Sequence, residues 1–446
     1  MSNNNSNGMD RRRFLRNGAV GVGALGVGMM GGGDLLHSQA EPQSQPGQET
    51  DRTWKIKEYR TLGRTEFKVS DIGSGFVKDP AVLGKMLDAG INYIDSAESY
   101  GNEEMIGAVL KNRDRKKIFV TTKLELKDDL SKEGILARAR KCLERLQTDY
   151  IDCLMIHSCE KVALIKTEGF HAAMQQLKSE GRLRFIGISH HGANFYKDPE
   201  EAMDKVLIAA ALDGRFDVML LAYNFIQDDK GAEVLKVCRE KNIGATLMKV
   251  NPIGKIPMMK ERIEKLKKDG KEIPGAYTQM ISRMEAKAKK AEAFIKEYRL
   301  DDDRRMRDAA VRFALSNPDV HTVCCAFLNF DSLDTYVSLS GTRLADMEKE
   351  KLAAYKEGCG SLYCRHACGL CEPVCPRGVP VNTIMRFNHY YEAQGKEKFA
   401  MKQYARLSAP KADRCRNCSG LCESACPYGV PVQGLLTMAH RTLSIA

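Results

Sequence analysis

Eight cysteines near the C-terminus have types and spacing that suit the binding of metal ions or clusters. They form two quartets, Cys364, Cys368, Cys371 and Cys375, then Cys415, Cys418, Cys422 and Cys426. Both quartets end in the sequence Leu-Cys-Glu-x-x-Cys-Pro-x-Gly-Val-Pro-Val, and Cys422 follows Cys371 at an offset of 51 residues. Thiolates this close together in sequence are ligands for iron-sulfur clusters, so the repeat points to electron transfer.

The quartets predict a particular sharing of ligands between two clusters. A cubane 4Fe-4S cluster needs four thiolates that converge from short loops. In bacterial two-cluster ferredoxins, three closely spaced cysteines hold one cluster and the fourth, before proline, holds the other. The predicted ligand sets are Cys364, Cys368, Cys371 and Cys426 for one cluster, and Cys415, Cys418, Cys422 and Cys375 for its partner.

Other interpretations of these cysteines stay open. Each quartet is one residue longer than the ferredoxin run, and Cys359 is a ninth thiol that could replace Cys364. Paired cysteines with short spacers also suit two tetrahedral zinc sites, and disulfides are a third possibility. The prolines after Cys375 and Cys426 favour the clusters, because zinc binding has no use for them.

Length and composition predict two domains preceded by a leader. The chain has 446 residues, and its 43% hydrophobic content is enough for a full-sized core. Its net charge of +11 is not accompanied by arginine-aromatic interleaving or a nucleic-acid motif, so we expect no nucleic-acid partner. The densest basic stretch, from Lys255 to Arg299, is interspersed with glutamates and is typical of solvated helix faces.

The N-terminal segment has the features of an export leader. The run from Arg11 to Arg13 is followed by Phe-Leu, as in a twin-arginine signal. A glycine-rich apolar stretch from Ala19 to Gly33 comes next, and Ser38-Gln-Ala40 offers a small-x-small cleavage site. We expect residues 1–40 to be a removable signal peptide and 41–55 a flexible linker. The apolar stretch is short, so no stable membrane span should remain.

Between this linker and the cysteines, short apolar runs alternate with helical patterns. Eight such runs separated by helices predict a closed parallel (β/α)8 TIM barrel, whose chemistry lies at the C-terminal strand ends. The expected strands are Ser70–Phe76, Tyr93–Ser96, Ile118–Leu124, Ile151–His157, Phe185–His190, Val218–Tyr223, Ala245–Val250 and Val320–Phe327.

The barrel is expected over residues 56–346. An N-terminal β-hairpin should precede the first strand, built from Tyr59–Leu62 and Phe67–Val69. We expect residues 255–300 to form a mostly helical insertion after strand seven. Residues 347–446 are expected to form a mainly helical, ferredoxin-like 4Fe-4S domain, which makes the fold class α/β with a helical C-terminal domain.

Three motifs at successive strand ends resemble the aldo-keto reductase family. They are Asp95-Ser-Ala-Glu-Ser-Tyr100-Gly, Val120-Thr-Thr-Lys123 and Asp149-Tyr-Ile-Asp-Cys-Leu-Met-Ile-His157. The resemblance covers the barrel region, and the cysteine-rich tail is similar to the iron-sulfur branch of that family. It implies Tyr100 as the general acid-base, Lys123 as its pKa modulator, Asp95 as the partner of Lys123, and His157 as the group that orients the carbonyl.

The chemistry of these side chains fits hydride transfer at a carbonyl carbon. A free tyrosine has a pKa of ~10 and exchanges protons slowly at neutral pH. An ammonium within hydrogen-bonding distance would stabilise the phenolate and lower that pKa, while a carboxylate keeps the lysine charged. A neutral histidine can donate to the substrate oxygen as charge develops on it.

The resemblance also implies a nicotinamide nucleotide, NADP(H), with an altered grip. The candidate contacts are Ser189, Gly254, Asn329 and Asp331. At the position after Ser189, where the family usually has asparagine, this chain has His190. Three residues before Tyr223, where the family has glutamine, it has Leu220. The pair that closes over adenine in the family corresponds to Thr335-Tyr336. The catalytic residues are thus intact while the cofactor clamp is partly rewritten.

These patterns together predict an exported oxidoreductase of aldo-keto reductase type. It would interconvert a small carbonyl (an aldehyde, ketone or sugar) and its alcohol, and exchange electrons with an unidentified redox partner through two 4Fe-4S clusters. Twin-arginine export carries folded proteins, so we expect it in the periplasm or another extracytoplasmic compartment. Two other functions stay open: a nicotinamide-independent electron-transfer protein, and a non-catalytic partner protein on a vestigial barrel.

Overall fold

The computed structural model describes most of the chain after the linker. The described residues are 54–192, 199–251, 268, 303–360, 363–365, 368–394 and 396–444. The predicted leader, Gly254 and almost all of the predicted insertion lie outside them. From Thr53 to Ala446 the chain forms one compact unit.

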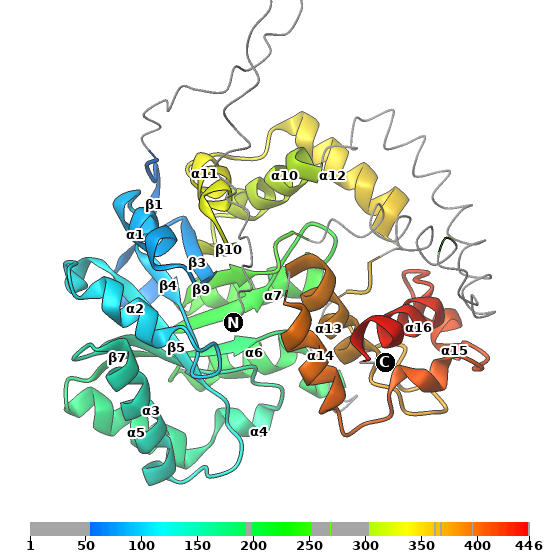
Figure 1. Cartoon of the computed structure of the whole chain (residues 1–446), viewed down its shortest axis with the longest axis horizontal. Helices are drawn as coiled ribbons and strands as arrows, with labels where there is room; N and C mark the ends of the chain where they lie inside the picture. The colour runs from blue at the N-terminus through cyan, green and yellow to red at the C-terminus, as the bar shows by residue number, and fades with distance from the viewer. Residues whose placement is uncertain are drawn as a thin grey trace, which may run out of the picture. The chain divides into compact units, whose positions relative to one another are not determined.

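Eight parallel strands close into a barrel in the order β10-β3-β4-β5-β6-β7-β8-β9 (Figure 1). The strands are β3 Ile72–Val77, β4 Tyr93–Asp95, β5 Phe119–Leu124, β6 Ile151–Ile156, β7 Leu183–His190, β8 Val218–Ala222, β9 Gly244–Met248 and β10 Thr322–Phe327. Each predicted run overlaps one of these strands, with ends that differ by up to two residues, so the eight-stranded barrel is confirmed. A short antiparallel hairpin, β1 Tyr59–Thr61 and β2 Lys68–Ser70, precedes it as predicted.

Helices follow the strands and cover the outside of the barrel (Figure 1). They are α1 Pro80–Asp88, α2 Glu103–Leu110, α3 Lys132–Leu146, α4 Val162–Ile165, α5 Glu168–Ser179, α6 Met203–Asp213, α7 Asp229–Glu240, α10 Asp303–Ser316, α11 Phe330–Ser338 and α12 Asp346–Cys359. Side chains with accepting oxygens start several of them: Asp79 caps α1, and Ser131 caps α3. No helix among the described residues is both long enough and apolar enough to span a membrane.

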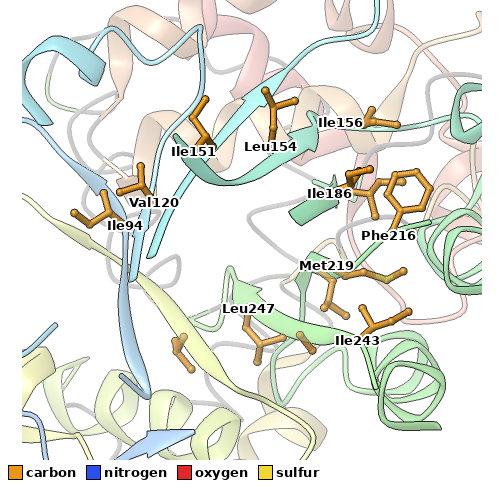
Figure 2. Close-up of a cluster of buried hydrophobic side chains, with 14 of the residues drawn as sticks. Ile94, Val120, Ile151, Leu154, Ile156, Ile186, Phe216, Met219, Ile243 and Leu247 are labelled. Atoms are coloured by element: carbon orange, nitrogen blue, oxygen red, sulfur yellow. The ribbon is translucent and has the colours of Figure 1, made fainter. Parts of the chain in front are cut away.

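Alternating side chains along the strands create two separate apolar layers. Outward residues such as Ile94, Val120 and Leu154, labelled in Figure 2, belong to a buried apolar cluster that also includes residues of the surrounding helices. Inward residues such as Tyr93 and Phe119 fill the barrel interior, where their rings stack at 5.6 Å between centroids. Because successive strand residues face opposite sides, this pattern also turns the residues two and four positions further along into the barrel.

The C-terminal segment is mainly helical and packs as part of the same unit. It contains α13 Val381–Gln394, α14 Glu397–Ala405, α15 Leu421–Ser424 and α16 Val432–Leu443, with a short 3-10 helix at Ala412–Cys415. Helix α13 packs against α14 and α16. Their apolar core is continuous with residues of α10 and α12, including Tyr355, whose ring meets Phe225 edge-on at 5.9 Å. The helical segment is therefore held against the barrel by a shared core.

Replacing Gly107 with alanine should destabilise the protein although alanine favours helices. A Cβ at Gly107 in α2 would lie 2.5 Å from the carbonyl oxygen of Leu146, at the end of α3. Overpacking of this kind costs about 1 to 3 kcal/mol, and the preference of a helix for alanine over glycine offsets about 1 kcal/mol of that cost. We expect the free energy of unfolding, measured by urea denaturation, to fall by about 1 kcal/mol.

Gly84→Ala is the matched control for this substitution. Gly84 lies within α1, and the nearest atom to an added Cβ is 3.8 Å away, on Arg113. This variant should be unchanged or more stable by up to about 1 kcal/mol. Equal stability of the two variants would contradict the close approach of α2 to the end of α3.

Candidate active site and cysteine cavities

A large pocket opens at the C-terminal ends of the barrel strands. It has a volume of about 2860 Å³, including space open to solvent, and Asp95, Tyr100 and His157 line it. Side chains of the C-terminal segment, among them Tyr390 and Lys396, line it as well. The predicted catalytic residues are therefore brought to one site, and the C-terminal segment forms part of its wall.

Strand alternation positions the predicted catalytic residues. Asp95 is the last residue of β4 and Lys123 lies near the end of β5, each an even number of positions after an inward aromatic residue. The Lys123 ammonium donates to Asp95 Oδ2 at 2.5 Å and to the carbonyl of Ser96 at 2.6 Å. Burial raises the pKa of Asp95 to about 6, although Lys123 opposes the rise. Asp95 and Lys123 thus form the expected ion pair beneath the pocket.

Tyr100 is half-buried in the pocket and surrounded by aromatic rings and cations. Its ring meets Phe76 and His157 edge-on at centroid distances of 5.8 and 5.7 Å. The Lys123 ammonium lies 4.8 Å from the centre of the Tyr100 ring. These contacts place the predicted acid-base, its charged neighbour and the predicted carbonyl-orienting group together.

The pKa of Tyr100 differs from the expected direction. Burial raises it well above its ordinary value, and the nearby Asp95 carboxylate adds to the rise. The Lys123 charge is turned toward Asp95 and the Ser96 carbonyl, so it does not outweigh the loss of water around a phenolate. The desolvation of the phenol, which the sequence motif does not indicate, therefore outweighs the effect of the ammonium. Tyr100 therefore keeps its proton at neutral pH and is suited to act as a proton donor.

His157 is neutral at physiological pH. It is 8% exposed, and burial lowers its pKa well below the ordinary value, with the charge of Lys123 adding to the effect. Its ring lies edge-on to His191, 5.2 Å between centroids. A neutral imidazole can donate a hydrogen bond to a carbonyl oxygen without carrying a full charge.

The candidate nucleotide contacts are not gathered at the pocket in the same way. Ser189 is fully buried, where its hydroxyl accepts from the Ser158 N–H at 3.0 Å and donates to the Ile156 carbonyl at 3.3 Å. Asn329 caps α11, and Asp331 lies in the first turn of that helix. The wall nearby includes Arg307, Ser332 and Tyr336. The pocket's size and this cationic end fit a dinucleotide, whereas the hydroxyl of Ser189 is already used by the protein.

Each predicted cysteine set lines one small cavity. Cys364, Cys368, Cys371 and Cys426 line a cavity of about 320 Å³, including space open to solvent. Cys375, Cys415, Cys418 and Cys422 line a second of about 330 Å³, which also includes space open to solvent. In both cavities, three cysteines come from one repeat and the fourth is the cysteine before proline of the other repeat, as in two-cluster ferredoxins.

The sequence repeat is also a structural repeat. Glu372 accepts from the backbone N–H of Asn382 at 2.6 Å, and Glu423 accepts from that of Gln433 at 2.9 Å. The glycine two residues after each Cys-Pro pair adopts a left-handed φ, 63° at Gly378 and 61° at Gly429. The two loops therefore present their cysteines in the same way because the same turn and the same carboxylate brace each of them.

The donor atoms around the two cavities determine which metal group each cavity could hold. The cysteines whose side chains are described form no disulfide. Within the described ranges, no group of three or more His, Cys, Asp or Glu side chains is placed to hold a metal ion. Each quartet instead lines one small pocket. Four thiols around one pocket supply the four thiolates that a cubane cluster needs, and by number they suit a tetrahedral zinc ion as well.

Burial keeps several of these thiols protonated when no cluster is bound. It raises the pKa of Cys415 and Cys422 to about 12, and the nearby thiol of Cys375 adds to both shifts. Cationic iron would reverse this effect, because metal ligands bind as thiolates. The electrostatic effect of Cys375 on Cys415 and Cys422 agrees with its position at the second cavity.

Sequence reasoning missed the pocket residues that come from other parts of the chain. Arg386 of α13 donates to Glu160, which follows β6, at 3.1 Å, and both side chains are less than a tenth exposed. The hydroxyl of Tyr390, also on α13, lies 3.2 Å from His191 Nδ1. An arginine on the buried face of a predicted helix could have signalled the first contact. Nothing in the local sequence indicates the others.

Comparison with known proteins identifies the barrel. A family model described as the aldo/keto reductase family matches residues 76–357, more than half of the chain. The chain belongs to this family. The match takes in the motifs that carry Asp95, Tyr100, Lys123 and His157, and it ends within α12.

Individual curated proteins match the chain over shorter stretches. An uncharacterized oxidoreductase, YqkF, of Bacillus subtilis (strain 168) is 32% identical over 158 residues, 31% of this chain and 51% of the relative. Methylglyoxal reductase DkgB of Escherichia coli O157:H7 is 32% identical over 124 residues, 27% of this chain and 46% of the relative. The chain therefore spans about half the length of these two curated relatives.

A plant enzyme and a solved structure match longer stretches. L-Galactose dehydrogenase of Arabidopsis thaliana is 31% identical over 210 residues, 42% of this chain and 63% of the relative. The holo form of the aldo-keto reductase AKR11C1 from Bacillus halodurans covers 66% of this chain and 95% of its own, with 22% identity and a TM-score of 0.47.

Proposed function

We propose that this aldo-keto reductase is an exported oxidoreductase that interconverts a small carbonyl and its alcohol and exchanges electrons through two 4Fe-4S clusters. One observation carries the proposal. The pocket that holds Tyr100 and His157 is walled by α13, and the N-terminal turn of the same helix lines the first cysteine cavity. Relatives named as methylglyoxal reductase and L-galactose dehydrogenase support a small carbonyl or sugar as the substrate.

The residues of the pocket supply proton transfer and orientation. When bound, a nicotinamide supplies or accepts hydride, and iron-sulfur clusters exchange single electrons. The protein's own part is to hold the carbonyl oxygen between Tyr100 and His157. Tyr100, which stays protonated, donates its phenolic proton to that oxygen as negative charge develops, and His157 donates a hydrogen bond. The raised pKa of Tyr100 keeps the phenol protonated at neutral pH, which is the state that carbonyl reduction requires.

Helix α13 provides a short connection between the two kinds of site. Asn382 in its first turn lines the first cysteine cavity, and Tyr390 lines the catalytic pocket. Eight residues of α-helix rise about 12 Å, so a single helix connects the two sites. Arg307 and Ser332 would hold the phosphate end of a nicotinamide nucleotide, because they wall the same pocket beyond β10.

The sequence features of residues 1–40 support export by the twin-arginine route. Clusters would be assembled before export, because that route carries folded proteins. In a compartment without a soluble nicotinamide pool, the clusters would give the barrel an electron outlet.

A second candidate is an electron-transfer protein that works without nicotinamide. The observation that favours it is Ser189, whose hydroxyl is committed to Ser158 and Ile156 instead of facing the pocket. The cysteine cavities would serve this function equally well.

Analysis of one anaerobically purified sample of the full chain tests the proposal. We expect about eight irons and eight sulfides per chain, because each cubane contains about four of each. We also expect bound nicotinamide nucleotide, and turnover of small aldehydes such as methylglyoxal. The sample should come from the periplasmic fraction of the cells.

Each measurement can overturn a different part of the proposal. Zinc without sulfide would overturn the clusters. A full complement of iron with no nucleotide and no carbonyl turnover would favour the electron-transfer alternative. Cluster-loaded protein found in the cytoplasm alone would contradict export.

A further inference from the structure

A lysine from the C-terminal segment extends into the catalytic pocket. Lys396 is the N-cap residue of α14, and its backbone N–H donates to the carbonyl of Tyr390 at 3.0 Å. Its ammonium lies 4.2 Å from the centre of the Phe76 ring and 5.7 Å from that of Tyr100. A lysine almost 300 residues away in sequence therefore shares the site of the predicted proton donor.

The Lys396 ammonium has aromatic neighbours but no hydrogen-bond acceptor within the described part of the chain. The rings of Phe76 and Tyr100 offer it only cation–π contacts, which are weaker than a hydrogen-bonded ion pair. The nearest influence of opposite charge is Asp95, which already accepts from Lys123. A half-buried ammonium in this setting would gain from an anionic partner.

Most other charged groups near Tyr100 in the pocket wall already have protein partners. The carboxylates of this wall are all partnered: Asp95 with Lys123, Glu125 with Lys127, Glu160 with Arg386, and Glu392 with the amide of Asn388. The ammonium of Lys249 donates to the carbonyl of His191. Among the described residues beside Tyr100, Lys396 is therefore the cation that remains available to bind a ligand.

We propose that Lys396 binds a carboxylate group on the substrate, so that the preferred substrates of this site are small aldehydes or ketones that also carry a carboxylate. This inference rests on the proposed carbonyl chemistry and adds the substrate class and a specificity-determining residue. The carboxylate would lie at Lys396 while the carbonyl oxygen lies at Tyr100 and His157. The residue acts on substrate binding, since proton transfer belongs to Tyr100.

The proposal has a pH signature. Burial lowers the pKa of Lys396 to about 8, the charges of Lys123 and Lys78 lower it further, and Asp95 opposes them. The rings of Phe76 and Tyr100 face the same ammonium. Lys396 is charged below pH 8 and loses its proton above it, so carboxylate binding should weaken as pH rises from 7 to 9.

Binding of succinate to the full chain, measured by isothermal titration calorimetry, tests this directly. Succinamide is the uncharged probe of the same shape. At pH 7 we expect succinate to bind the wild type at least tenfold more tightly than succinamide, and Lys396→Met to remove most of that preference. Lys396→Arg should restore part of it. Lys398→Met, which removes an exposed charge from the same helix, should leave binding within about twofold.

Turnover of 4-oxobutanoate and of its neutral amide completes the test. Lys396→Met should raise KM for 4-oxobutanoate about tenfold or more and leave KM for the amide nearly unchanged. Equal succinate binding by wild type and Lys396→Met, or binding that does not weaken between pH 7 and 9, would overturn the inference. Carbonyl turnover without any carboxylate preference would overturn it and leave the proposed function standing. Lys396-dependent succinate binding without turnover of any carbonyl would instead defeat the proposed function.

Discussion

Replacing Tyr100 with phenylalanine should lower kcat for carbonyl turnover by about 10³-fold or more. General acid catalysis by a positioned side chain contributes about 10² to 10⁴ in rate, and Tyr100 is the protonated phenol beside His157 in the pocket. The ring and its edge-on contacts with Phe76 remain in the variant, so the fold should be unaffected. Steady-state kinetics with methylglyoxal and a thermal unfolding curve would measure the two effects.

Tyr59→Phe is the control for loss of a phenolic hydroxyl. Tyr59 lies in the N-terminal hairpin, and its hydroxyl donates to the carbonyl of Gly90 at 2.9 Å, away from the pocket wall. This variant should retain nearly full kcat. Full activity of Tyr100→Phe would remove Tyr100 from the mechanism. A raised KM with an unchanged kcat would make Tyr100 a binding residue.

Two double cysteine variants should differ sharply in iron content. The crossed arrangement places Cys371 with Cys426 at one cavity and Cys375 at the other. Cys371→Ser with Cys426→Ser therefore removes two ligands of one cluster, and about four of eight irons should be lost. Cys371→Ser with Cys375→Ser removes one ligand from each cluster and should affect both, with up to about eight irons lost. Iron and sulfide analysis of anaerobically purified protein would show the difference.

The opposite pattern of iron loss in the two double variants would contradict the crossed ligand sets. If each repeat held its own cluster, the pair Cys371 and Cys375 would empty one site and the pair Cys371 and Cys426 would damage both. Cys238→Ser is the control, because this thiol is buried in α7 within the barrel core and lines neither cavity. Its iron content should match the wild type.

Local patterns predicted the barrel and the inner part of the site. Alternation along β4 and β5 turns Asp95 and Lys123 inward at the strand ends, and the family motifs indicate the same positions. Strand ends were placed only to within two residues, because pairing with neighbouring strands decides where each strand stops. The cysteine spacing also predicted the crossed quartets, since a duplicated loop that folds twice in the same way places equivalent residues equivalently.

Burial could not be judged from the sequence, and it changed the chemistry of the site. The motif led us to expect Lys123 to lower the pKa of Tyr100, but the pKa is raised. Desolvation depends on every group that surrounds the phenol, including side chains brought by the C-terminal helices. A motif records the partner of a residue but not how much water remains around it.

The amino-acid sequence by itself determined the eight strands, the inward positions of Asp95, Lys123 and His157, and the cysteine repeat. These features follow from short-range rules, the two-residue period of a strand and the fixed spacing within a loop. Only the tertiary structure decided that α13 lies along the barrel mouth, that Arg386 pairs with Glu160, and that Lys396 stands beside Tyr100. Those contacts join segments more than 200 residues apart, and they form because two helical layers share one apolar core.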